Sequence, residues 1–126
     1  MMNVLIVDED TTFAAVYAAA LMKAGFVVHT ASEARQTLAI LDREKIDTMI
    51  TEVLLPGRNG IKLIQDIRLR EDTIDLPVFI LTTLEAADVG LADSLAEVLG
   101  VKGYFTKQHT TPDALVEHLE ASSTAH

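Results

Sequence analysis

The amino-acid sequence alternates five times between a short strand-like run and a segment whose apolar residues recur at helical spacing. The strand-like runs are expected at residues 4–7, 26–28, 48–51, 78–81 and 103–106. Strands that alternate with helices usually form a parallel sheet, because each helix carries the chain back to the edge where the next strand begins. The pattern therefore predicts a doubly wound α/β domain with a five-stranded parallel sheet and helices on both faces.

Several helix starts can be predicted from polar residues that precede an apolar-periodic segment. Asp10 and Asn59 are expected to cap the first and third helices, because their side-chain oxygens can accept a hydrogen bond from an early N–H group. For the second helix, Thr30 and Glu33 have the spacing of a capping box, and Ser32 is an alternative cap. A fourth helix is expected to contain Leu91, Leu95, Val98 and Leu99 and to end at Gly100.

Polar residues follow four of the five predicted strands. They are Asp8, Glu9, Glu52, Thr82 and Lys107. Right-handed crossovers place the carboxyl ends of all parallel strands at one edge of the sheet, and open α/β sheets bind their ligands at that edge. The convergence of these residues indicates a functional site.

Composition restricts the classes to which the chain can belong. With 126 residues and 49% hydrophobic residues, it is expected to form one globular domain over residues 1–121, followed by a flexible tail at 122–126. The net charge of −9 disfavours direct binding to nucleic acid. The absence of Cys, of a leader and of an apolar run of membrane-spanning length suggests a cytoplasmic protein that does not contact a membrane.

Residues 5–10, 54–60, 77–82 and 100–107 together resemble the receiver domains of bacterial response regulators, the CheY-like superfamily. The resemblance covers essentially the whole chain. It implies a flavodoxin-like (βα)5 fold with strand order 2-1-3-4-5. It also implies a two-component signalling module rather than an enzyme, monomeric or weakly dimeric. Its protein partner would be a sensor kinase, an output domain or another signalling protein, bound by the face of the fourth helix, fifth strand and fifth helix.

The resemblance assigns roles by position. In the family, an acidic pair after the first strand binds Mg²⁺, and an Asp after the third strand accepts a phosphoryl group. A Ser or Thr after the fourth strand and a Lys after the fifth contact that group, and an aromatic residue three before the Lys reports the change to a binding surface. Asp8 and Glu9 match the metal pair, Thr82 the hydroxyl, Tyr104 the aromatic residue and Lys107 the lysine.

Glu52 stands where the family has the phospho-accepting Asp. Glu is longer by one methylene, roughly 1.5 Å, and a displacement of about 1 Å can slow a reaction that depends on positioning on the order of 100-fold. Its single charge partly imitates a phosphate, which carries about −1.5 to −2.

Three interpretations of Glu52 remain open within the family. The receiver acts without phosphorylation, with Glu52 held near Lys107, or Glu52 is a drifted residue in an inactive pocket. These two differ on whether Glu52→Gln changes partner binding. The third is a conventional Mg²⁺-dependent receiver that uses Glu52 as the phospho-acceptor.

Metal binding is expected to be weak or absent. Asp8, Glu9 and Glu52 would place three carboxylates together, and a cation is needed to offset their mutual repulsion. Mg²⁺ suits such an all-oxygen site, but Lys107 is an alternative counter-charge.

Two further expectations concern the neighbourhood of this site. Gln108 replaces the Pro that usually follows the lysine in a cis linkage; we predict a trans bond, because a cis bond before a residue other than Pro costs about 2.5–4 kcal/mol. A flavodoxin-like cofactor binder is the alternative from a different functional class. It is disfavoured because residues 8–10 are all acidic where such a protein needs a phosphate-binding loop.

Overall fold

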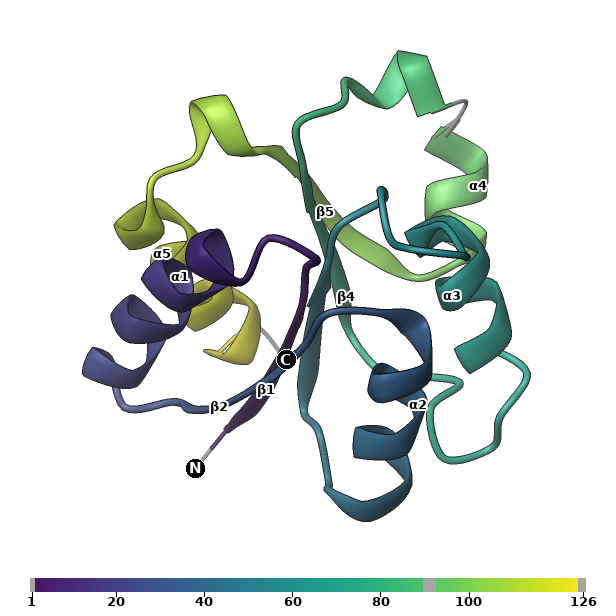
Figure 1. Cartoon of the computed structure of the whole chain (residues 1–126), viewed down its shortest axis with the longest axis horizontal. Helices are drawn as coiled ribbons and strands as arrows, with labels where there is room; N and C mark the ends of the chain where they lie inside the picture. Colours follow the sequence, from purple (N-terminus) through teal and green to yellow (C-terminus); the bar gives the residue numbers. More distant parts are fainter. Residues whose placement is uncertain (1, 90–92, 125–126) are drawn as a thin grey trace.

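A single parallel sheet forms the centre of the protein in this computed structural model, which describes residues 2–89 and 93–124 (Figure 1). Its strands are β1 (Asn3–Val7), β2 (Val27–Ala31), β3 (Thr48–Thr51), β4 (Val78–Thr82) and β5 (Val101–Thr106). They are arranged in the order β2-β1-β3-β4-β5. The predicted fold class and strand order are therefore confirmed.

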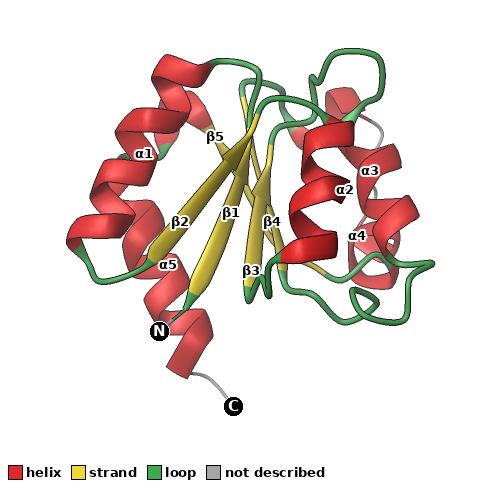
Figure 2. Cartoon of the chain, turned by 60° about the horizontal axis from the view of Figure 1, so that its bottom comes forward, coloured by secondary structure: helices red, strands yellow, loops and turns green. Residues whose placement is uncertain are grey.

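Helices cover both faces of the sheet, as Figure 2 shows. The helices are α1 (Thr11–Lys23), α2 (Ala34–Arg43), α3 (Gly60–Ile67), α4 (Asp93–Val98) and α5 (Pro112–Thr124). Helices α1 and α5 lie on one face, and α2, α3 and α4 lie on the other. None of the helices in the described ranges is long and apolar enough to cross a bilayer.

The sheet separates two apolar cores, because side chains alternate between its faces. In β1, Leu5 and Val7 face the core under α2 and α3, whereas Val4 and Ile6 face the core under α1 and α5. All four side chains are buried, as expected for a central strand covered on both sides. This packing holds the ends of the central strands in place, and the candidate site lies at those ends.

Two predicted helix caps are confirmed and one is wrong. Asp10 accepts a hydrogen bond from Phe13 N at 3.0 Å, and Asn59 accepts one from Lys62 N at 2.8 Å. The second helix is capped by Glu33, rather than by the expected Thr30 or Ser32. The expectation failed because β2 continues through residue 30, so its backbone pairs with β1 and is not available to begin a helix.

The region between β4 and β5 differs most from the expected single helix. A 3₁₀ turn spans Ala86–Val89 and the short helix α4 begins at Asp93. Leu91, and the side chain of Leu95, lie outside the described part of the structure; of the other two predicted helix residues, Leu99 is buried and Val98 is exposed. The last helix, α5, continues to residue 124, past the expected domain limit at residue 121.

Candidate functional site

The candidate site contains two carboxylates, Asp8 and Glu52, and each directly follows a central strand. Asp8 N donates to Ala31 O and Glu52 N donates to Val7 O, both at 2.9 Å, so the hydrogen-bonding pattern of the sheet continues one residue past β1 and β3. This backbone pairing fixes the direction of both side chains at the carboxyl edge of the sheet. Both are buried, at 5% and 4% exposure.

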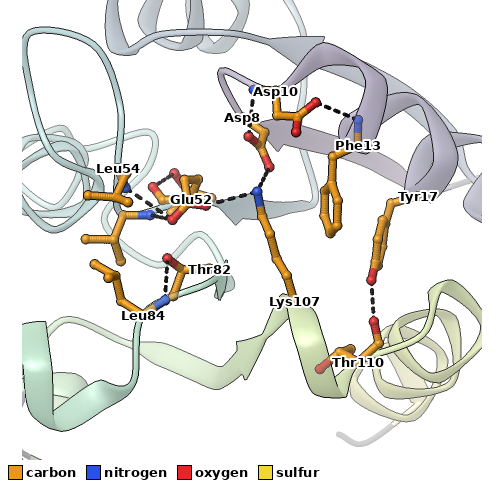
Figure 3. Close-up of polar contacts among 12 residues, drawn as sticks. Asp8, Asp10, Phe13, Tyr17, Glu52, Leu54, Thr82, Leu84, Lys107 and Thr110 are labelled. Atoms are coloured by element: carbon orange, nitrogen blue, oxygen red, sulfur yellow. Dashed lines mark hydrogen bonds and ion pairs between the residues drawn. The ribbon is translucent and has the colours of Figure 1, made fainter.

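Lys107 connects the two carboxylates (Figure 3). Its Nζ lies 2.7 Å from Asp8 Oδ2 and 3.0 Å from Glu52 Oε2, and its side chain is only 11% exposed. The lysine follows β5, at the edge of the sheet away from β1, and its long side chain reaches back across the strand ends. The three charges therefore form one buried cluster with a net charge of −1.

The remaining carboxylate oxygens accept hydrogen bonds from backbone N–H groups. Asp8 Oδ1 accepts from Asp10 N at 2.9 Å. Glu52 Oε1 accepts from Val53 N at 2.7 Å and Leu54 N at 3.1 Å. Buried charges persist in folded proteins when they are paired and hydrogen-bonded, and here each of the four oxygens has a donor. Two N–H groups and one ammonium therefore surround the Glu52 carboxylate.

The pKa shifts in the cluster follow from burial and from the charges that face each group. Burial raises the pKa of Asp8, and the hydrogen bonds from Lys107 and from Asp10 N offset this effect only in part. Burial lowers the pKa of Lys107, but its contacts with Asp8 and Glu52 together outweigh burial, so its pKa is raised. Both shifts favour the bound proton, because an added proton reduces the charge that the cluster buries.

Two aromatic residues of α1 also belong to this site. The Lys107 ammonium lies 4.1 Å from the centre of the Phe13 ring, within cation–π range. The Tyr17 ring stacks on Phe13, and its hydroxyl donates to Thr110 O in the loop that follows Lys107. The spacing of four residues between Phe13 and Tyr17, one turn after an acidic segment, is the signal that could have indicated them.

Thr82 and Tyr104 lie beside the cluster and contact the loop that follows β4. The Thr82 hydroxyl accepts a hydrogen bond from Leu84 N at 3.4 Å, and the Tyr104 hydroxyl donates to Leu84 O at 2.7 Å. The side-chain amide of Gln108 donates to Thr83 O at 3.1 Å, and the Lys107–Gln108 bond is trans, as predicted. Tyr104 is half-buried, and burial raises its pKa, with a further contribution from the Glu52 charge.

Glu9 is not brought into the cluster. Its side chain is exposed and makes no hydrogen bond or ion pair with a described residue. Within the described ranges, no group of three acidic or His side chains is placed to hold a metal ion. The Lys107 ammonium already bridges Asp8 and Glu52. The arrangement therefore does not fit an Mg²⁺ ion bound by Asp8, Glu9 and Glu52.

Gly60 allows the loop after Glu52 to fold back tightly. Its N–H donates to Val53 O at 2.7 Å. A Cβ atom at this position would lie 2.1 Å from the backbone oxygen of Glu52, so no larger residue fits without moving the loop. Asn59 and Gly60 thus combine a helix cap with a close backbone contact at the site.

The comparisons with known proteins agree with this geometry. The model of the family "Response regulator receiver domain" matches residues 4–120. Over 119 residues the chain is 32% identical to the phosphate regulon transcriptional regulatory protein PhoB of Pseudomonas aeruginosa, covering 94% of this chain and 50% of PhoB. It is 36% identical over 83 residues to ycf29 of Cyanophora paradoxa, covering 66% of this chain and 40% of that protein. The chain thus spans half or less of the length of these curated relatives.

A solved structure supports the same comparison. The chemotaxis response regulator CheY4 of Vibrio cholerae superposes with a TM-score of 0.83 and 25% sequence identity, over 96% of this chain and 98% of that one.

Proposed function

The chain belongs to the family of response regulator receiver domains of two-component signalling, and from this premise we propose that it acts without being phosphorylated. In this proposal the Glu52 carboxylate occupies the place of the phosphorylated side chain and holds Lys107 permanently. The module then signals by binding a protein partner. The family match lends no support to the flavodoxin-like alternative.

One observation carries the proposal: the Lys107 ammonium is already engaged by Glu52 at 3.0 Å and by Asp8 at 2.7 Å. The family resemblance makes this lysine a contact of the phosphoryl group. The N–H groups of Val53 and Leu54 are also taken by Glu52. An incoming phosphoryl group would have to displace the carboxylate from all three donors.

The same geometry bears on metal binding and catalysis. We expect Mg²⁺ to bind weakly or not at all, because Lys107 supplies the positive charge that neutralises part of the cluster. Phosphoryl transfer depends on accurate placement of the attacking oxygen. Both Glu52 oxygens are instead held by donors, and the module is therefore proposed to be a binding protein rather than an enzyme.

The proposed partner surface is the face of α4, β5 and α5. Tyr104 and Gln108 connect the cluster to the loop after β4, since they hold Leu84 O and Thr83 O respectively. The partner would be a sensor kinase, an output domain or another signalling protein in the cytoplasm. The acidic chain is not expected to bind nucleic acid itself.

Beryllofluoride, which imitates a phosphoryl group on an acceptor carboxylate, tests the proposal. We expect the amide NMR spectrum of the protein to stay unchanged when beryllofluoride and Mg²⁺ are added. The matched control is Glu52→Asp, which restores the shorter acid. A beryllofluoride adduct on Glu52, with shifts in the loop after β4, would overturn the proposal.

A second measurement distinguishes a Glu52 that maintains a signalling state from a Glu52 that lies in an inactive pocket. Glu52→Gln removes the charge but keeps the length of the side chain. If Glu52 maintains a signalling state, the substitution shifts amide resonances as far as Leu84 and Tyr104. If the pocket is inactive, the shifts stay confined to residues that contact position 52.

A further inference from the structure

The surface around the loop between β3 and α3 differs in charge from the rest of the chain. The chain has a net charge of −9, but Arg35, Arg58 and Lys62 all lie on this surface. Two grooves flank the loop. The first, of about 360 Å³, is lined by residues that include Arg35, Leu38, Pro56 and Arg58. The second, of about 460 Å³, is lined by Val53, Leu54, Asn59, Ile61, Lys62 and Gln65.

These cations have few acidic partners of their own. Arg58 pairs with Asp66, and the Lys62 ammonium lies 3.9 Å from the same residue. Arg35 forms no ion pair with any residue in the described ranges. The carboxylate of Glu33, the acid that lines the first groove, caps α2 by accepting from Gln36 N. The surface therefore retains positive charge on a strongly acidic protein.

The second groove also exposes apolar area. Leu54 is 55% exposed, and it lines the groove together with Ile61, which packs partly against the core. A single exposed Leu is common on protein surfaces. Here it stands beside another apolar side chain in a concave surface, with a cation at its rim, which is the arrangement of a binding site for an apolar anchor.

The loop that presents Leu54 is fixed at both ends. Glu52 Oε1 holds the N–H groups of Val53 and Leu54, and Gly60 N holds Val53 O at 2.7 Å. Asn59 caps α3 at the far end. A surface that is ordered before binding loses less conformational entropy when a partner docks.

We propose that this surface, the β3–α3 face (Arg35, Leu54, Arg58, Ile61 and Lys62), docks a protein segment that presents a large apolar side chain flanked by carboxylates. The apolar side chain enters the groove beside Leu54, and the carboxylates pair with the cations. Nucleic acid is disfavoured as the occupant, because three cations do not offset the repulsion of a phosphate backbone by an acidic chain. The inference goes beyond the proposed function, since no residue of α4, β5 or α5 lines either groove and the docking does not require Glu52 to escape phosphorylation.

Selection from a library of random short peptides, followed by NMR titration of the selected peptide, tests the inference. We expect the peptides to combine a large apolar residue with Asp or Glu and to shift amide resonances of residues 53–65. Leu54→Ala is expected to weaken binding about tenfold, as for an interface anchor. Lys62→Glu is expected to weaken it about fivefold or more.

Matched controls use residues of the same type on other surfaces. Leu69→Ala removes a Leu that is 86% exposed in the turn after α3, and Lys102→Glu reverses an exposed charge on β5; both should leave the affinity unchanged. The inference is overturned if no peptide is selected or if the peptides lack acids. It is also overturned if binding maps elsewhere or survives Leu54→Ala. A beryllofluoride adduct on Glu52 would contradict the proposed function, whereas the peptide titration uses the protein without beryllofluoride and tests this inference alone.

Discussion

Lys107 is the residue on which the arrangement of the site depends. Its ammonium contacts Asp8, Glu52 and the face of Phe13, three groups from the ends of two strands and from one helix. Without this cation, two carboxylates would remain buried with no positive partner. The loss of one member of a buried ion pair typically costs about 3–5 kcal/mol.

Lys107→Met is therefore expected to lower the free energy of unfolding by about 3–5 kcal/mol, measured by urea denaturation at neutral pH. Lys102→Met is the control, because Lys102 is exposed and forms no ion pair among the described residues. It should change the free energy of unfolding by no more than about 0.5 kcal/mol. Equal effects of the two substitutions would show that the cluster contributes nothing to stability.

The raised pKa of Asp8 predicts how stability depends on pH. The folded protein binds this proton more tightly than the unfolded chain does, so the contribution of Asp8 to stability is complete below its ordinary pKa of 3.8. It is lost as the pH rises through the higher, folded-state pKa. In Asp8→Asn this loss is absent, so the stability of the variant relative to the native protein should increase with pH above 3.8.

Urea denaturation of both proteins at a series of pH values from about 3 to 7 measures this difference. A difference that stays constant, or that decreases with pH, would mean that burial does not govern the ionisation of Asp8.

The strand-end pattern was enough to predict that Asp8, Glu52 and Lys107 share one edge of the sheet. It was not enough to identify Phe13 and Tyr17, because apolar spacing on a helix shows that a side chain faces inward without showing what it meets. Glu9 shows the opposite limit. It follows the same strand as Asp8, but successive residues point in different directions, and only the structure shows that Glu9 is exposed.

At the scale of elements, continuous apolar runs such as that of β1 were predictable, because a strand buried on both faces admits few other residues. The start of α2 was not, since the choice between strand and cap at residue 30 depends on pairing with β1. The apolar spacing between β4 and β5 predicted one helix, whereas the structure has a 3₁₀ turn and the short helix α4. Tertiary contacts also shape this segment, and one of these contacts comes from Arg68.

Arg68 connects the end of α3 to the segments that enter β4 and β5. Its guanidinium donates to Leu99 O at 2.7 Å, Thr73 O at 2.9 Å and Leu76 O at 2.6 Å. A half-buried carbonyl group that loses its charged donor destabilises the folded state, because its hydrogen bond is not replaced. Arg68→Met should therefore lower the free energy of unfolding by about 3 kcal/mol. Urea denaturation measures the change.

Arg68→Lys should recover only part of this stability, because an ammonium lacks the planar fork that reaches several carbonyl groups at once. Arg35→Met is the control, since Arg35 is exposed and should change stability by no more than about 0.5 kcal/mol. If Arg68→Met matched that control, these hydrogen bonds would not hold the segments together.

At the scale of the whole molecule, the sheet joins one buried site to two separate surfaces. Tyr104 and Gln108 link the site to the loop after β4, and the Glu52 hydrogen bonds link it to the loop after β3. A charged side chain in place of a transient phosphoryl group would keep both loops in one state. We therefore propose that Glu52 takes the place of the phosphoryl group.

Intact-protein mass spectrometry after incubation with acetyl phosphate and Mg²⁺ shows whether Glu52 can be phosphorylated. We expect the native chain to keep its mass, whereas a phosphoryl group gained at position 52 in Glu52→Asp would show that the reagent and the pocket are competent. A native chain that gains the mass of one phosphoryl group, located on Glu52, would mean that Glu52 does not replace phosphorylation.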